Sequence, residues 1–263
     1  MNAILAGIVF AVVLSVGILV LLEIGRRVGV RRLAEEGETA SKGLSAIEGA
    51  IFGLLGLILA FLFSGALTRF DAARHLVVEE ANDIGTAWLR IALLPADAQP
   101  SMRDLFRRYL DSRIEVYRRV PNIPDTEAVR AALAGSTNLQ SEIWALAVSS
   151  SREAGTVQTP LLLLPALNAM FDIATTRTEA TRLDPPMMIF AMLGALTLAC
   201  SLFAGYDMAI RRHLNLNVLY SIAFAVVLSV TAYVIIDLEY PRLGLMQVTD
   251  SDRVLVDLRR SMN

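Results

Sequence analysis

The stretch IFGLLGLILAFLFSGALTRFDAARHLVVEEAN, residues 51–82, decides the fold. It opens as an apolar run long enough for a membrane span and closes as a charged amphipathic helix, with no proline at the join. Because no residue here lacks a backbone N–H, nothing local requires the helix to stop. The sequence therefore predicts one helix that leaves the bilayer and continues into water.

Three further stretches resemble the apolar part of this one. A span needs about 20 consecutive apolar residues to cross the hydrocarbon core. Four stretches meet that length, at 4–22, 50–68, 187–206 and 219–236. The first lacks the basic leading region and small-residue cleavage site of a signal peptide, so we expect it to remain a span. The chain is therefore predicted to be a multi-pass integral membrane protein.

The long segment between spans two and three is predicted to be helical and outside the bilayer. Its clearest helix, over 101–120, carries apolar residues at spacings of three and four, which form one stripe. They are Met102, Leu105, Phe106, Tyr109, Leu110, Ile114 and Tyr117. Prolines at 121 and 124 should end this helix. Further helices are expected up to Gly135, from 137 to Gly155, and from 165 onward.

No stretch shows the alternation of a β-strand. The expected fold class is therefore an all-α integral membrane protein with four transmembrane helices and a helical extramembrane layer between spans two and three. Residues 1–69 would form the first transmembrane pair, 70–185 the extramembrane region and 186–237 the second pair. The tail, 238–263, would pack on the extramembrane region.

Small residues mark one face of the second span. They are Gly49, Gly53, Gly56, Ala60 and Ser64, at spacings of four, three, four and four. Small residues let helix backbones approach closely, which favours helix association in lipid. The partner could be another span of the same chain or the same helix of a neighbouring subunit.

A second set on this helix lies beside the first. Gly53, Leu57 and Phe61 are spaced four apart, so they share a face. Bulky apolar side chains directed at a common axis could form a hydrophobic constriction that closes by dewetting. A face directed at lipid would have the same composition, so the pattern leaves both interpretations open.

The segment LAFLFSGALTRFDAAR, 59–74, resembles the second-span signature of bestrophins. Arg69, Phe70 and Arg74 match that signature, whereas Asp71 replaces its second aromatic residue. Together with IFGLLGLILAF, EANDIGTAWLRIALLP, PALNAMFDI and IDLEYPRLGLMQV, it is similar to a bestrophin-like family of bacterial membrane proteins. The similarity extends over nearly the whole chain from Glu48.

The resemblance implies a homopentameric ion channel in the inner membrane of a bacterium. Its second spans would line a hydrophobic neck at Gly53, Leu57 and Phe61, and its middle segment would build a cytosolic vestibule. Gly53 is smaller than the residue usual there, so the narrowest point would lie at Leu57 and Phe61. The expected partners are further copies of the chain, membrane lipids and small inorganic ions.

Other chemistry is not expected. Animal bestrophins hold calcium in an acidic turn after span four, but here only Asp237 and Glu239 stand at that place, so we predict no calcium site. His75 and His213 lie on different predicted elements, and no spacing typical of a metal or catalytic site appears. A net charge of −2 argues against nucleic acid. We therefore expect no cofactor and no enzyme activity.

Two carboxylates at 79–80 could serve a proton pathway, but on an amphipathic helix such pairs are usually solvated or paired with arginine. Two other classes of function also remain open. One is a non-conducting membrane scaffold, whose sign would be an exposed apolar patch on 100–160. The other is a transporter, which would require broken helices at mid-membrane and an internal repeat. The sequence shows neither of the transporter features.

The orientation of the chain receives conflicting signals. The two short loops carry seven Lys and Arg residues, against five near the opposite ends of the spans. The positive-inside rule therefore favours the middle segment outside the cell. The family layout places this segment in the cytosol instead, and we adopt that expectation.

Overall fold

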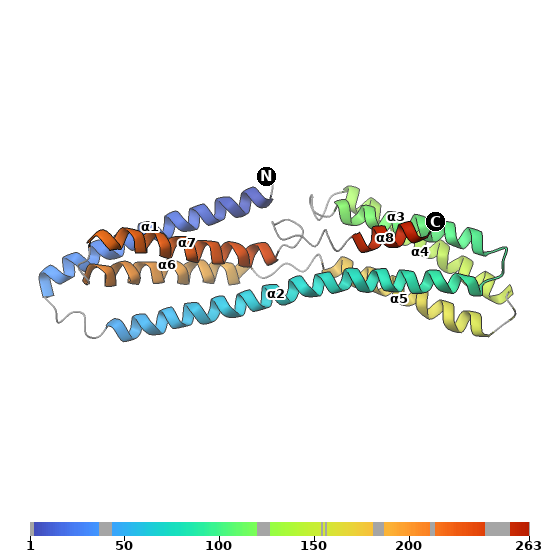
Figure 1. Cartoon of the computed structure of the whole chain (residues 1–263), viewed down its shortest axis with the longest axis horizontal. Helices are drawn as coiled ribbons and strands as arrows, with labels where there is room; N and C mark the ends of the chain where they lie inside the picture. Colours follow the sequence, from blue (N-terminus) through green and yellow to red (C-terminus); the bar gives the residue numbers. More distant parts are fainter. Residues whose placement is uncertain are drawn as a thin grey trace. The chain divides into compact units, whose positions relative to one another are not determined.

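The computed structural model describes residues 3–36, 44–119, 127–153, 155, 157–180, 187–210, 214–239 and 253–262. All regular structure within these ranges is helical, which confirms the expected all-α class (Figure 1). The elements in chain order are α1 (Ala3–Glu36), α2 (Leu44–Arg90), η2 (Ile91–Leu93), α3 (Gln99–Arg119), α4 (Glu127–Glu153), α5 (Gln158–Ala180), α6 (Met187–Ile210), α7 (Leu214–Glu239) and α8 (Arg253–Ser261).

The four expected spans are confirmed as four helices that are long and apolar enough to cross a membrane. By length and composition, the candidate segments are Ile8–Ala34, Glu48–Leu93, Met188–Ala209 and Val218–Glu239. The second begins in α2, a helix of 47 residues without interruption, and ends in η2. The opening stretch of sequence is therefore one helix, as its lack of proline predicts.

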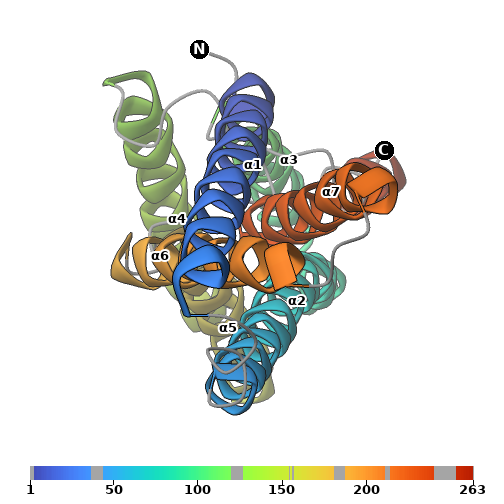
Figure 2. The same cartoon turned by 90° about the vertical axis from the view of Figure 1, so that its left-hand side faces the viewer.

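The chain forms two compact units, which are described separately below. The membrane unit comprises residues 1–70 and 185–246, and the helical unit comprises residues 71–184 and 247–263. Helix α2 contributes to both. Figure 2 shows α1, α6 and α7 of the membrane unit toward the viewer. Leu14, Ile18 and Leu22 of α1 are buried in the cluster that includes Ala225 and Ala232 of α7.

Within the membrane unit, the backbones of α1 and α6 approach each other closely at glycine residues on both helices. A Cβ atom added to Gly25 would lie 2.0 Å from the backbone oxygen of Leu202, and one added to Gly205 would lie 2.0 Å from that of Leu22. Gly29 is similarly close to Tyr206. No L-residue with a side chain fits these distances, so the two backbones are in direct contact. Such close packing is how helices associate where lipid supplies no hydrophobic force.

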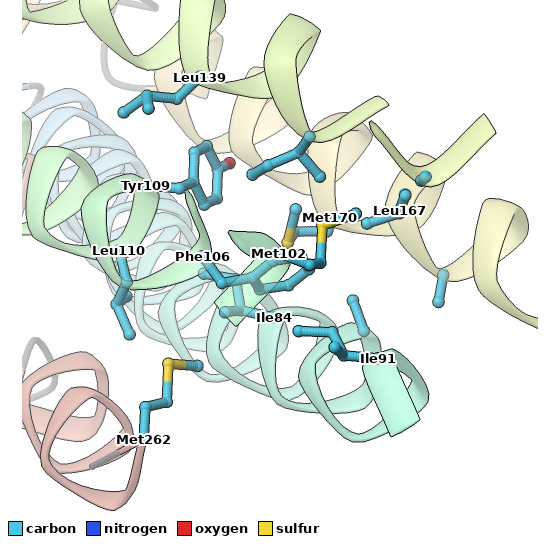
Figure 3. Packing of buried hydrophobic residues seen from close by; sticks show 14 of the residues in the cluster. Ile84, Ile91, Met102, Phe106, Tyr109, Leu110, Leu139, Leu167, Met170 and Met262 are labelled. Carbon is cyan, nitrogen blue, oxygen red and sulfur yellow. The ribbon is translucent and has the colours of Figure 1, made fainter. Parts of the chain in front are cut away.

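The helical unit is built around one apolar core, contributed by α2, η2, α3, α4, α5 and α8. Ile84 and Ile91 lie beside Met102 and Phe106, with Leu167 and Met170 of α5 close by (Figure 3). The stripe predicted on 101–120 is confirmed: five of its seven residues are buried, and Leu105 and Ile114 pack against the core from its edge. Amphipathicity alone therefore identified this face.

Two predicted helix boundaries are wrong. Gly135 lies inside α4, which continues from Glu127 to Glu153. Glycine costs only about 1 kcal/mol in a helix interior, and the apolar stripe continues past it through Leu139 and Ile143, both buried. Helix α5 begins at Gln158, so Pro165 lies within it rather than at its start. The predicted end at Gly155 agrees with the structure, where this residue has φ of 64°.

The C-terminal helix α8 packs on α3. Leu255 and Met262 are buried in the core of the helical unit. Arg259 donates hydrogen bonds of 2.8 and 3.1 Å to the two carboxylate oxygens of Asp111, and Arg107 Nε donates to the carbonyl of Met262 at 2.9 Å. The tail is thus held by apolar burial and by charged contacts.

Residues 120–126, which include the prolines predicted to end the helix over 101–120, lie outside the described ranges.

Both tryptophans of the chain lie in the helical unit. Trp88 packs against Phe106, with ring centroids 6.2 Å apart, and the guanidinium carbons of Arg103 and Arg107 lie 5.5 and 5.7 Å from its ring. Trp144 of α4 packs against the same core. Trp88 therefore packs against the core from its edge, with two cations stacked on its ring.

Candidate functional site

The membrane part of α2 has one face that packs against its own unit. Leu55 is buried in a cluster with Leu193 and Cys200 of α6. Further along, Ala66 is buried with Ile235 and Leu238 of α7. These contacts recur at the period of a helix, so the opposite face of α2 is directed away from α6 and α7.

That opposite face carries the predicted neck residues. The exposed fraction of Leu57 is 52%, and that of Phe61 is 70%. A Cβ atom added to Gly53 would meet no atom within 4 Å. The three residues thus share one face of α2, and no described part of the same chain covers it.

The small residues beside this face also have no packing partner in the described part of the chain. Gly49 and Gly56 have no atom within 4 Å of a built Cβ atom, and Ala60 and Ser64 are exposed. Close helix packing within the membrane unit occurs instead between α1 and α6. Those glycines were not predicted, although Gly25 and Gly29 form a G-x-x-x-G pattern that is typical of such packing.

The three residues of the bestrophin signature have different surroundings. Arg69 forms an ion pair with Glu239 at the end of α7, and Phe70 packs in the cluster around Ala66. Arg74 is largely exposed and lies 3.9 Å from Asp71. Residues three apart on a helix lie on one face, which brings Asp71 and Arg74 within reach of each other.

A buried charged cluster centres on Glu80 in the helical unit. Arg113 Nε donates to Glu80 Oε1 and Arg177 Nη1 donates to Oε2, each at 2.6 Å. Arg113 also donates to the hydroxyl of Tyr117 and to the carbonyl of Ala174, the latter at 3.2 Å. Glu80 is fully buried, and the other three charged or aromatic side chains are nearly so. One carboxylate thus joins α2 to α3 and α5.

The electrostatics of this cluster keep Arg113 charged and Tyr117 neutral. Burial by itself would lower the pKa of Arg113, but the charge and hydrogen bond of Glu80, together with the phenols of Tyr117 and Tyr109, outweigh it and raise that pKa above its ordinary value. Burial raises the pKa of the Tyr117 phenol, and the Glu80 charge adds to that rise. The Arg177 guanidinium carbon lies 3.4 Å from the centroid of the Tyr117 ring, a cation–π contact. Burial also raises the pKa of Tyr109 to about 12.

The sequence anticipated part of this cluster. Of the two carboxylates at 79–80, Glu79 is exposed and Glu80 is paired with arginine. The arginine partners lie 33 and 97 residues further along the chain, and no local pattern indicated them.

The histidines and acidic residues considered for metal chemistry form no metal site within the described ranges. Among the described residues, no group of three or more His, Cys, Asp and Glu side chains could hold a metal ion. His75 is exposed, and His213 lies outside the described ranges. Cys200 is buried between α6 and α2. Asp237 is buried too, and Glu239 is bound to Arg69.

These features define the chain as an all-helical membrane protein with four candidate spans and a helical unit between the second and third. A family model described as the Bestrophin-like domain matches residues 9–252. The chain therefore belongs to the bestrophin-like family, which confirms the resemblance seen in its motifs.

Solved structures of a bacterial bestrophin homologue from Klebsiella pneumoniae match this chain over nearly its whole length. One mutant of that homologue aligns at 15% identity with a TM-score of 0.70, covering 94% of this chain and 98% of that chain. A structure phased with zinc aligns at 16% identity with a TM-score of 0.68, covering 92% and 97%. At such identity the likeness shows the fold alone. None of the curated proteins matches the chain.

Proposed function

We propose that this protein is a homopentameric ion channel of a bacterial inner membrane. In this assembly α2 of each copy lines a hydrophobic neck, and the helical unit forms a vestibule in the cytosol. Leu57 and Phe61 form the narrowest point, whereas Gly53 leaves a wider ring. Small inorganic ions pass along the axis, and the protein conducts them rather than transforming a substrate.

The observation that carries this proposal is the exposed apolar face of α2. Phe61 is 70% exposed in the single chain although the other face of the same helix is packed against α6 and α7. Several copies arranged around an axis would bring these side chains together, and a narrow apolar ring can close a pore by dewetting. The uncovered small residues Gly56 and Ala60 beside this face would let neighbouring α2 helices approach.

Removing the neck should increase conduction. We expect Leu57→Ala combined with Phe61→Ala to raise the single-channel conductance severalfold in planar lipid bilayers, because the wider and less apolar ring stays hydrated. The measurement is current at several voltages in symmetrical salt, with the purified protein reconstituted at equal amounts.

Phe63→Ala is the matched control for this test. It removes the same side chain from the same helix, but about 200° around the helix from Phe61, and Phe63 is also exposed. We expect its conductance to equal that of the unmodified protein. Electrical silence of both the unmodified protein and the double variant across several salts would contradict the channel proposal.

The orientation of the helical unit is testable at Arg130. This residue is exposed on α4, and we expect Arg130→Cys, in a Cys200→Ala background, to resist a membrane-impermeant thiol reagent in intact cells and to react after lysis. Reaction in intact cells would place the unit outside the cytosol, as the positive-inside rule favours. A cysteine introduced in periplasmic sequence of another protein serves as the labelling control.

A non-conducting scaffold is the second candidate, favoured by one observation. Exposed apolar side chains gather where η2 meets α5, and Thr159 Oγ1 donates to the carbonyl of Leu93 there at 3.2 Å. They are Leu89, Leu93, Val157, Leu161 and Leu162. Within the described part of 100–160, Val157 alone is a large exposed apolar residue. Most of the patch therefore lies next to the 100–160 segment, where the scaffold hypothesis expected an apolar patch, rather than within it. A single-particle reconstruction with a lipid-filled axis and a partner protein on this patch would favour the scaffold.

A further inference from the structure

One ion pair joins the membrane part of α2 to the end of α7. Arg69 Nε donates to Glu239 Oε2 at 2.7 Å, and Arg69 Nη2 donates to the other carboxylate oxygen. A two-point pair between a guanidinium and a carboxylate fixes orientation as well as distance. Both residues belong to the membrane unit, although 170 positions separate them in the sequence.

The two sides of this pair differ in exposure: the Arg69 side chain is 54% exposed, whereas the carboxylate is shielded from water. The Glu239 side chain is 3% exposed, so its carboxylate depends on Arg69 for compensation of its charge. Ala66, Ile235 and Leu238 are buried directly beside the pair, where α2 packs on α7. The guanidinium lies beside Gly65, where an added Cβ atom would be 3.4 Å from Arg69 Nη1, an ordinary van der Waals distance. The guanidinium therefore lies back along α2 instead of extending away from it.

The neighbouring arginine of the signature offers a contrast. Arg74 is 3.9 Å from Asp71 on the same helix, and both side chains are more than half exposed. Exposed pairs of this kind contribute little because water and salt screen them. Arg74 also contacts no second helix through this pair. Of the two arginines in the signature, only Arg69 ties α2 to another helix by its ion pair.

We propose that the Arg69–Glu239 pair is a clamp that positions the pore helix. It sets the rotation and height of α2 against α7 and so keeps Leu57 and Phe61 directed at the pore axis. Arg69 follows Phe61 by eight residues, about 12 Å along one helix, so rotation of α2 at the clamp is carried to the neck. This role rests on the proposed channel function, with Arg69 and Glu239 as positioning residues that touch no ion.

The test measures the position of α2 separately from conduction. In a Cys200→Ala background, Phe61→Cys is modified with a charged, water-soluble thiol reagent in the reconstituted protein, and the rate is followed by mass spectrometry. We expect Arg69→Gln and Glu239→Gln each to change this rate by about tenfold, the effect of about 1.4 kcal/mol on an equilibrium. The charge-swapped pair Arg69→Glu with Glu239→Arg should restore most of the original rate. Arg74→Gln is the matched control and should leave it unchanged.

Conduction is then recorded for the same clamp variants with Phe61 retained. Changed conduction that the swapped pair restores supports the clamp. Modification rates that stay the same in both single variants overturn it, whatever the currents show. If the rates change and are restored by the swap but every variant is silent, α2 is clamped and it is the channel function that fails. Loss of the assembled oligomer in the single variants, with no recovery in the swapped pair, also overturns the proposal.

Discussion

Glu80→Gln is expected to lower the free energy of unfolding of the helical unit by about 3–5 kcal/mol, since it breaks a buried ion pair from one side. The substitution preserves shape but removes the negative charge to which both Arg113 and Arg177 donate. The two guanidiniums remain in an interior from which water is excluded. Domains are stable by only about 5–15 kcal/mol, so a large part of the stability of this unit would be lost.

Limited proteolysis of the solubilised protein measures this effect. Glu79→Gln is the matched control, because it changes the adjacent carboxylate, which is exposed. We expect cleavage within the helical unit to begin at a clearly lower temperature for Glu80→Gln and at an unchanged temperature for Glu79→Gln. Equal cleavage temperatures for both variants would show that Glu80 contributes no more than a solvated carboxylate.

Gly25→Ala and Gly205→Ala should disrupt the membrane unit more than any other single methyl group added to the spans. In each case the new Cβ atom would lie 2.0 Å from a backbone oxygen of the facing helix. Because that contact is with backbone rather than a flexible side chain, α1 and α6 must separate. Overpacking of this kind costs about 1–3 kcal/mol, occasionally more, and we expect the upper end of that range here.

Gly194→Ala on α6 is the control, since nothing lies within 4 Å of a Cβ atom built there. The temperature at which each detergent-solubilised variant aggregates should fall for Gly25→Ala and Gly205→Ala and stay near the original for Gly194→Ala. Equal temperatures for all three would contradict the direct backbone contact between α1 and α6.

The fold was largely predictable because its main signals are local. The absence of proline between 51 and 82 and the apolar stripe of α3 each depend on residues a few positions apart, and helical hydrogen bonds join residues four apart. The error at Gly135 has the same origin. A glycine weakens a helix locally, but the buried residues Leu139 and Ile143 on the same face stabilise α4 through tertiary packing that local propensity does not contain.

The candidate site was predictable only in part. The spacing of Leu57 and Phe61 predicted a shared face, and the structure places both on the side of α2 that its own chain leaves uncovered. The partners of charged residues were not predictable, because Arg69 and Glu239 are 170 positions apart and Glu80 and Arg177 are 97 apart. A carboxylate has the same local sequence signal whether it is solvated or buried, so burial and pairing became visible only in three dimensions.

The positions of Trp88 and Trp144 make intrinsic tryptophan fluorescence a probe of one unit of the molecule. Both indoles lie in the helical unit, and the membrane unit contains no tryptophan among its residues. Intrinsic emission excited at the red edge of indole absorption therefore reports on one unit alone. Unfolding of the α3–α4–α5 region should shift the emission wavelength, whereas separation of α1 from α6 should leave it unchanged. One fluorescence measurement therefore distinguishes unfolding of the helical unit from unfolding of the membrane unit.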